Sequence, residues 1–253
     1  MDVVLLQRDI IWADPKSNRA GIDKAFERNG RADLFVLPEM FSTGFATEPE
    51  GIAENEPCET LEWMKERAAS LDAAIAGSVL VLSGGKYYNR MYFVKPDGEV
   101  TVYDKKHLFT YGSEPDHITA GDRRVVVEWR GARFLLLVCY DLRFPVWVRN
   151  RGDYDAIICV ANWPTVRRNA WDCLKRARAI ENQCYMLAVN RVGVDPTVEY
   201  NGGTAFINFY GEVEAAAEDG VECSIRGGID MSKLGEFASK FPVLKDADRF
   251  EIK

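Results

Sequence analysis

Residues 132–147 of this 253-residue chain read ARFLLLVCYDLRFPVW, an apolar segment that leads directly into a cysteine. Such a segment predicts a strand that ends at Cys139. Two more apolar segments end in a similar way, because Glu39 follows LFVLP and Lys105 follows VYD. The sequence therefore places a thiol, a carboxylate and an ammonium at the ends of three predicted strands.

The order of the predicted strands and helices indicates an α/β protein. Strands are expected near residues 3–10, 33–37, 73–82, 87–94, 99–104, 124–129, 132–138, 154–160 and 184–190. Helices are expected near residues 16–29, 57–71, 145–151, 168–182 and 230–240. These expectations follow from the apolar segments and from the helix-start and turn signals between them.

Two short segments indicate an internal repeat. KPDGEV (95–100) and NFYGEV (208–213) occupy corresponding places in the two halves of the chain, and each is typical of a hairpin turn. Because each sheet must cover both of its faces, two such halves predict a four-layer αββα sandwich, with two sheets face to face and helices outside. The polar residues after the strands would then meet at one end of the sheets, where ligands of α/β proteins tend to bind.

Composition supports a single domain over residues 1–253. The chain is 47% hydrophobic, and no Pro/Ser-rich linker divides it. Its 32 basic and 39 acidic residues give a net charge of −7 with both signs interspersed, which argues against a nucleic-acid-binding surface. The N-terminal segment MDVVLLQRDIIW carries charges within its apolar pattern, so neither a signal peptide nor a membrane span is expected. Six cysteines without a disulfide pattern predict a cytoplasmic protein.

The three residue types at the strand ends suit the cleavage of an amide through a thioester. A thiol is mostly protonated at neutral pH, so it needs a base such as Glu39, or a neighbouring cation, to become a nucleophile. Attack on a carbonyl places negative charge on its oxygen, which Lys105 and the backbone amide of Tyr140 would stabilise. The carboxylic acid can then pass the proton to departing ammonia, and the carboxylate can activate water to hydrolyse the thioester.

Each of these residues also has a simpler explanation when it is considered alone. A cysteine at the end of an apolar strand is more often an inert core thiol, a Pro-Glu pair is usually a turn, and a Lys-Lys pair is usually exposed. The other five cysteines are interpreted as core thiols: Cys58, Cys159, Cys173, Cys184 and Cys223. The two histidines form no metal-binding pattern, and no phosphate-binding loop or serine-nucleophile motif occurs, so no metal or cofactor is expected. His107 is interpreted as structural.

Taken together, three strings resemble the nitrilase (carbon–nitrogen hydrolase) superfamily: LFVLPEMFSTGF, VYDKKHLF and VCYDLRFPVW. The resemblance implies that Glu39 is the general base and Cys139 the nucleophile. It also implies that Lys105, two places before the histidine, is the cation at the oxyanion. A further carboxylate that positions this lysine in the family maps to Glu114 in YGSEPDH.

Two later strings, DYDAIICVANWP and RARAIENQCYMLAVNRVG, resemble the omega-amidase branch of that superfamily. This resemblance implies hydrolysis of the terminal amide of short 2-oxo acids such as 2-oxoglutaramate, or of similar dicarboxylic acid monoamides. One alternative is another carbon–nitrogen hydrolase, acting on a nitrile or a carbamoylated amine. A second alternative is a nitrilase-fold protein that binds or assembles without turnover, but the complete set of Glu, Lys and Cys favours an enzyme.

The segment after the strand near 154–160 supplies candidate substrate-binding residues. This strand corresponds in the repeat to the one before Glu39, so Trp163 is expected to wall the pocket. A monoamide with a free carboxylate also needs a cation, for which Arg167 is the candidate, although Arg167 is equally typical of an exposed helix start. Arg143 is near the nucleophile and is expected to form a structural ion pair.

The C-terminal segment FPVLKDADRFEIK (241–253) carries more apolar residues than a free tail would. It either docks on its own domain or reaches across to a partner. By resemblance to the superfamily, a two-fold homodimer or a higher homo-oligomer is expected, with residues 145–151 and 168–182 at the centre of the two-fold contact and the tail adding to it. Trp147 and Trp171, on those two helices, are residues of a type enriched in interface cores.

Overall fold

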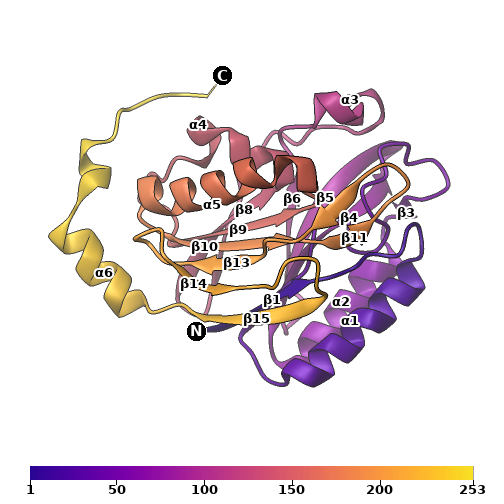
Figure 1. Cartoon of the computed structure of the whole chain (residues 1–253), viewed down its shortest axis with the longest axis horizontal. Helices are drawn as coiled ribbons and strands as arrows, with labels where there is room; N and C mark the ends of the chain where they lie inside the picture. The colour runs from indigo at the N-terminus through magenta and orange to yellow at the C-terminus, as the bar shows by residue number, and fades with distance from the viewer. Residues whose placement is uncertain (253) are drawn as a thin grey trace.

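Two β-sheets packed face to face form the centre of the computed structural model, which describes residues 1–252 (Figure 1). The first sheet has the strand order β15-β1-β2-β4-β5-β6, with β3 beside β4, and the second has the order β14-β13-β10-β9-β8-β7. The first sheet contains β1 (Asp2–Gln7), β2 (Leu34–Val36), β3 (Glu54–Asn55), β4 (Ala74–Ser83), β5 (Lys86–Val94), β6 (Val100–Asp104) and β15 (Cys223–Gly228). The second contains β7 (Val126–Trp129), β8 (Ala132–Val138), β9 (Ala156–Ala161), β10 (Tyr185–Asn190), β13 (Ala205–Ile207) and β14 (Val213–Ala216). A separate hairpin consists of β11 (Val192–Val194) and β12 (Glu199–Asn201).

Helices cover the outer faces of both sheets and complete four layers (Figure 1). The helices of the described residues are α1 (Pro15–Asn29), α2 (Glu59–Leu71), α3 (Glu114–His117), α4 (Pro145–Val148), α5 (Arg168–Asn182) and α6 (Met231–Lys240). Helices α1 and α2 lie on the first sheet, and α4 and α5 lie on the second (Figure 1). No helix within residues 1–252 is both long and apolar enough to cross a membrane.

The apolar strands are continuous because both of their faces are buried. In β1, Val3 and Leu5 belong to the core between the two sheets, whereas Val4 and Leu6 pack in the layer beneath α1 and α2. Alternate side chains of a strand point to opposite faces, so a sheet that is covered on both sides needs apolar residues at every position. The predicted four-layer αββα sandwich is confirmed.

The predicted repeat is visible in the order and direction of the strands. In the first sheet, β1, β2 and β4 are parallel and β5 and β6 continue antiparallel; β8, β9, β10, β13 and β14 repeat this order in the second sheet. The two hairpin turns also match. Gly98 N–H donates to Lys95 O at 3.0 Å, and Gly211 N–H donates to Asn208 O at 2.9 Å. Strand β9 therefore corresponds to β2, as the sequence predicted.

Several predicted boundaries and one predicted role are wrong. Strand β1 ends at Gln7 rather than at residue 10, because its partner β15 pairs with it only as far as Gln7. Helix α4 ends at Val148, where Arg149 takes a non-helical ψ of 124°. Trp147 and Trp171 are only 6% and 0% exposed and pack inside their own subunit, so they cannot form the centre of an interface.

Candidate active site

The three predicted catalytic residues lie just beyond the strands that were expected to deliver them. Lys105 directly follows β6, Cys139 directly follows β8, and Glu39 comes three residues after the end of β2. Cys139 has a φ of 48°, a left-handed conformation that is unfavourable for a residue with a side chain, and it opens a 3₁₀ turn over Cys139–Arg143. This backbone turn takes the thiol out of the strand and towards the space beside Glu39.

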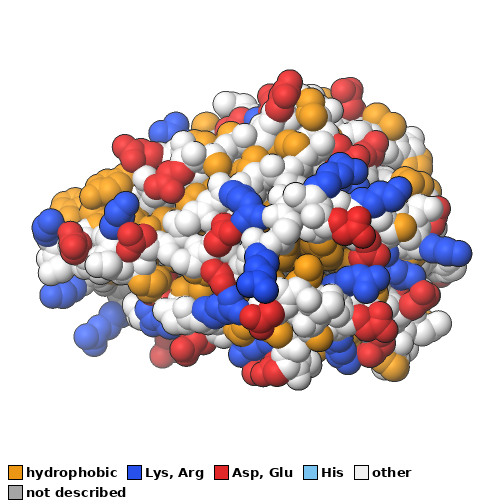
Figure 2. Space-filling view, turned by 90° about the horizontal axis from the view of Figure 1, so that it is seen from below, with side chains coloured by type: hydrophobic (Ala, Val, Ile, Leu, Met, Phe, Trp, Pro, Cys, Tyr) orange, Lys and Arg blue, Asp and Glu red, His pale blue; other side chains and the backbone are white. Residues whose placement is uncertain are grey.

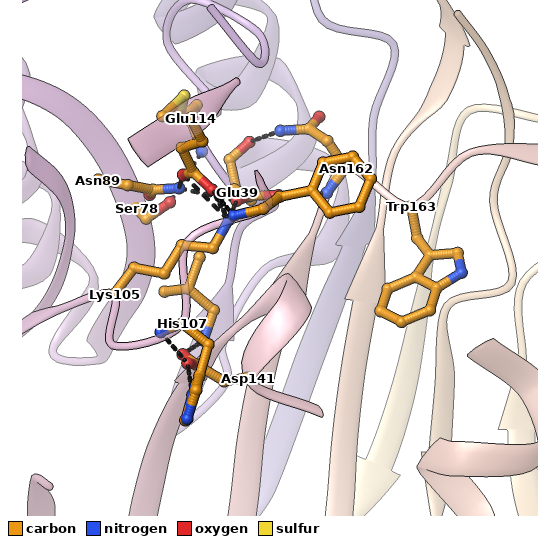
Figure 3. A network of polar contacts seen from close by, with 12 residues as sticks. Glu39, Ser78, Asn89, Lys105, His107, Glu114, Asp141, Asn162 and Trp163 are labelled. Carbon is orange, nitrogen blue, oxygen red and sulfur yellow. Dashed lines mark hydrogen bonds and ion pairs between the residues drawn. The ribbon is translucent and has the colours of Figure 1, made fainter. Parts of the chain in front are cut away.

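Lys105 is held between two carboxylates in the interior (Figure 3). Its Nζ lies 3.0 Å from Glu39 Oε1, and 3.1 and 2.9 Å from Glu114 Oε1 and Oε2. All three side chains have 0% exposure. Burial alone would lower the pKa of Lys105, but the charges of Glu114 and Glu39 outweigh it and raise that pKa, which favours the charged ammonium.

Glu114 is fixed by the loop that follows Lys105. Its Oε2 accepts a hydrogen bond from the backbone N–H of Phe109 at 2.6 Å in addition to its two contacts with Lys105. Burial and the nearby Glu39 raise the pKa of Glu114, while Lys105 opposes them. The structure thus brings Glu114 to Lys105, where the motif had placed it.

Two asparagines that were not predicted as site residues complete the contacts of Glu39 (Figure 3). Asn89 Nδ2, from β5, lies 2.7 Å from Glu39 Oε1. Asn162, immediately after β9, donates its backbone N–H to Glu39 Oε2 at 2.7 Å and its Nδ2 to the Glu39 backbone oxygen at 2.8 Å. The repeat had indicated that the segment around Asn162 lies near the site, whereas no pattern marked Asn89.

Cys139 is a half-buried residue and lines a cavity at the surface of the site, whereas Glu39, Lys105 and Glu114 lie behind it in the interior. Burial raises the pKa of this thiol, the negative charge of Glu39 raises it further, and Lys105 acts in the opposite direction. These effects favour the neutral thiol, and the carboxylate beside it is paired with Lys105. Tyr140 is the second residue of the 3₁₀ turn, and an N–H in the first turn of a helix has no partner within that helix.

His107 and Asp141 support the loops around the site. Asp141 Oδ1 accepts from the backbone N–H of His107 at 2.9 Å and lies 2.8 Å from its Nδ1, while Oδ2 accepts from the hydroxyl of Tyr103 at 2.7 Å. The His107 ring stacks on Phe144 with a centroid distance of 3.8 Å. These contacts agree with the structural interpretation of His107. Within residues 1–252, no cluster of His, Cys, Asp and Glu side chains is suited to hold a metal ion.

A cavity of about 200 Å³ opens in front of Cys139, with aromatic walls and two arginines. Its aromatic lining residues are Phe45, Phe109, Tyr111, Tyr140, Trp163 and Tyr200. Trp163 is buried and donates its Nε1–H to the Arg167 backbone oxygen at 2.9 Å, so it forms a wall as predicted. Tyr200 comes from the β11–β12 hairpin, which the sequence analysis did not anticipate.

Arg143 and Arg167 both face this cavity. The Arg143 guanidinium lies 4.8 Å from the centroid of the Trp163 ring, and that of Arg167 lies 5.2 Å from the centroid of Phe109. Among the described residues, no carboxylate lies within 4.0 Å of either guanidinium. The expected ion pair of Arg143 is therefore wrong, because an aromatic ring takes the place of the carboxylate.

A buried Glu–Lys–Glu network beside a strand-end thiol, between two packed sheets, defines a class of amide- and nitrile-cleaving enzymes. The chain belongs to the carbon–nitrogen hydrolase family, whose model matches residues 5–239. It is 43% identical to omega-amidase YafV of Escherichia coli (strain K12) over 255 residues, which cover 100% of this chain and 98% of that protein. It is 33% identical to the 2-oxoglutaramate amidase of Bacillus subtilis (strain 168), with 95% of each chain covered.

A solved structure agrees with this assignment. The protein XC1258 of Xanthomonas campestris, a member of the same superfamily with an arsenic adduct in its active site, superposes with a TM-score of 0.97 at 40% identity. The match covers 100% of this chain and 99% of that one. The predicted superfamily and the predicted resemblance to the omega-amidase branch are confirmed.

Proposed function

We propose that this protein is an amidase that hydrolyses the terminal amide of a short 2-oxo or dicarboxylic acid monoamide through a Cys139 thioester. The observation that carries the proposal is the combination of a buried Glu39–Lys105–Glu114 network beside the thiol with two arginines that face the cavity and have no carboxylate partner among residues 1–252. Relatives named omega-amidase and 2-oxoglutaramate amidase support the same substrate class.

Glu39 is the base of the proposed reaction. It takes the proton of the Cys139 thiol as sulfur attacks the amide carbon, and the charge on the carbonyl oxygen is stabilised by Lys105 and the Tyr140 N–H. Glu39 then gives its proton to the leaving nitrogen, so that the C–N bond breaks and ammonia departs. The carboxylate next takes a proton from water as the resulting hydroxide attacks the thioester. The C–S bond then breaks to release the acid, and Glu39 returns its proton to the sulfur, which restores the thiol and the carboxylate.

The cavity supports a small anionic substrate. Its volume of about 200 Å³ suits a molecule of a few carbon atoms. Arg143 and Arg167 can each offer two parallel N–H donors to a carboxylate, the geometry for which guanidinium is suited. A monoamide of a short dicarboxylic acid would place its amide at Cys139 and its carboxylate at these arginines. Nitriles and carbamoylated amines without a carboxylate would leave the arginines unused.

An assay of ammonia release tests this proposal. We expect turnover of 2-oxoglutaramate and succinamate, slower release from glutamine, and none from the Cys139→Ala variant. A neutral amide of the same length is the matched control for the role of the carboxylate, and its KM should be higher. Faster cleavage of a short nitrile than of any amide would assign the protein to another specificity. Binding of the amides without turnover would indicate the non-catalytic alternative.

We also propose that the whole chain, residues 1–253, forms one domain that assembles as a two-fold homodimer; Lys253 lies outside the described residues. Side chains that a partner could cover remain exposed on α4, α5 and the tail: Val146 (55%), Ile180 (50%), Phe241 (58%), Phe250 (36%) and Ile252 (43%). Figure 2 shows hydrophobic side chains gathered towards the end of the molecule that carries α6 and the tail. Burial of such a surface stabilises an isologous contact.

Light scattering of the intact chain and of a truncation ending at Lys240 tests the assembly. We expect a dimer for the intact chain and a weakened dimer for the truncation. A monomeric intact protein would contradict the dimer, and an unchanged dimer after truncation would contradict the part of the tail. The proposed cytoplasmic location rests on six free thiols, which persist in a reducing compartment, and cell fractionation would test it.

A further inference from the structure

Asn89 is a buried polar residue whose side chain lies between the two carboxylates of the site (Figure 3). It belongs to β5, in the middle of the strand, and has 0% exposure. Its Nδ2 lies 2.7 Å from Glu39 Oε1 and 3.4 Å from Glu114 Oε1. Its backbone oxygen also accepts from the backbone N–H of Lys105 at 3.0 Å, so Asn89 contacts both carboxylates through its side chain and Lys105 through its backbone.

The orientation of the Asn89 amide follows from its neighbours. A flipped amide would place Oδ1 against two carboxylate oxygens, where it would be repelled, so the nitrogen must face them. In the observed orientation, Oδ1 has no hydrogen-bond partner among residues 1–252. An unpaired buried acceptor is unfavourable. The unpaired Oδ1 is retained in the folded protein, which indicates that the Nδ2 hydrogen bond to Glu39 is needed.

The two oxygens of Glu39 have different surroundings. Oε1 receives both Lys105 Nζ at 3.0 Å and Asn89 Nδ2 at 2.7 Å. Oε2 receives the backbone N–H of Asn162 at 2.7 Å. A carboxylate oxygen can accept about two hydrogen bonds, so Oε1 is fully occupied and Oε2 has one position left.

We propose that Asn89 is a positioning residue: together with Lys105 it saturates Glu39 Oε1, and so directs proton exchange with Cys139 to Oε2. In this exchange the S–H bond of Cys139 breaks and an Oε2–H bond forms. The same proton later leaves Oε2 for the departing nitrogen. The inference rests on the proposed role of Glu39 as the general base.

The net charge of the site explains why a neutral donor is required. Two carboxylates and one ammonium leave one negative charge in a space that excludes water. A hydrogen bond to the ionised form of an acid favours that form, so Asn89 stabilises the Glu39 carboxylate without adding a second cation. A second buried ammonium would instead stabilise the carboxylate further and make it a weaker acceptor for the Cys139 proton.

Two variants of nearly the same shape test the inference. Asn89→Leu removes the donor, and Asn89→Asp replaces the donor with an acceptor. Loss of the hydrogen bond removes a donor that stabilises the Glu39 carboxylate, so the acid limb of the pH profile of kcat/KM should move to higher pH. We expect a shift of about one pH unit for Asn89→Leu, a larger one for Asn89→Asp, and a fall in kcat of about 10- to 100-fold with little change in KM.

Asn150→Leu is the matched control, because Asn150 is also a buried asparagine but bonds the backbone of Tyr154 and Asn182 instead of the site. It should lower stability and leave the acid limb in place. If Asn89→Leu does not fold, Asn89→Asp carries the test. An acid limb that does not move in a folded Asn89 variant overturns the inference.

A second measurement separates this inference from the proposed function. The rate of Cys139 alkylation by iodoacetamide, followed on the Cys139 peptide by mass spectrometry, also depends on an ionised Glu39 but needs no substrate. Its acid limb should shift in the Asn89 variants in the same direction. If wild-type protein hydrolyses none of the amides, the proposed function fails, and the alkylation profile still decides the role of Asn89.

Discussion

The charged side chains beside Cys139 and those at the mouth of the cavity are arranged in opposite ways. Lys105, Glu39 and Glu114 are fully buried and paired with one another. Arg143 and Arg167 are half-buried and lie over aromatic rings, and no carboxylate of the described part of the chain pairs with them. A fully buried charge must be paired in the protein itself, because its desolvation is too costly otherwise. A guanidinium that retains contact with water can be left for a ligand. The comparison indicates that the chemistry is preassembled, while recognition is completed by the substrate.

The largest effect is expected when the inner network is broken. In Lys105→Met, two buried carboxylates would face each other without a cation, and the oxyanion would lose its charged donor. We expect kcat to fall by about 10²- to 10³-fold. We also expect a loss of stability of about 3–5 kcal/mol, typical of a broken buried ion pair.

The pH dependence of stability checks the cause of that loss. Without Lys105, the burial that raises the pKa of Glu114 is no longer opposed by a cation. The folded variant is then favoured at low pH, where this carboxyl is neutral, and loses stability as the pH rises through its raised value. The deficit in urea unfolding should therefore be smaller at pH 4 than at pH 8. A variant with near-normal turnover would mean that Lys106 or backbone amides stabilise the oxyanion.

A smaller effect is expected when the outer arginines are changed. Arg143→Met and Arg167→Met keep much of the apolar volume but remove the donors for a carboxylate. We expect KM for 2-oxoglutaramate to rise by about 10- to 100-fold, since a charged hydrogen bond contributes roughly 1.5–3 kcal/mol. kcat should change much less, because the inner network is intact.

A neutral short amide is the control for both arginine variants, since its KM should not change. If KM for the anionic substrate stays at the wild-type value in both variants, the arginines do not recognise it. A large fall in kcat without a change in KM would instead place one of them in the catalytic network and remove the distinction between the two regions.

The sequence predicted the inner region better than the outer one, and the reason is physical. Glu39, Lys105 and Cys139 each follow an apolar strand, so their positions are fixed by where those strands end in the sheets. Asn89 lies inside strand β5, KYYNRMYFV. Whether its side chain reaches the site depends on how β5 pairs in register with β4 and β6. No local pattern carries that information. Asn162 was located through the repeat, but its contacts with Glu39 arise only when the two sheets pack.

The outer region depends on contacts between distant loops. The contact of Arg143 with Trp163 joins residues that follow two different strands. From the sequence alone, an arginine expected in the interior is interpreted first as part of an ion pair. The β11–β12 hairpin has only three residues in each strand, which is too short for a clear alternation. Its Tyr200 was therefore missed as a wall of the cavity.

The smallest expected effect belongs to Phe45, the residue at which the two regions meet. Its ring lines the cavity, and Lys105 Nζ lies 5.2 Å from the ring centroid. Such a contact contributes about 0.5–1 kcal/mol, so Phe45→Leu should lower kcat by roughly 2- to 5-fold. Phe45→Tyr keeps the ring and is the matched control, with kcat close to wild type. Steady-state kinetics with 2-oxoglutaramate shows to which of the two regions Phe45 belongs. A fall in kcat at constant KM assigns it to the inner network. A rise in KM at constant kcat would instead assign it to recognition, and the boundary between the two regions would then lie closer to Lys105.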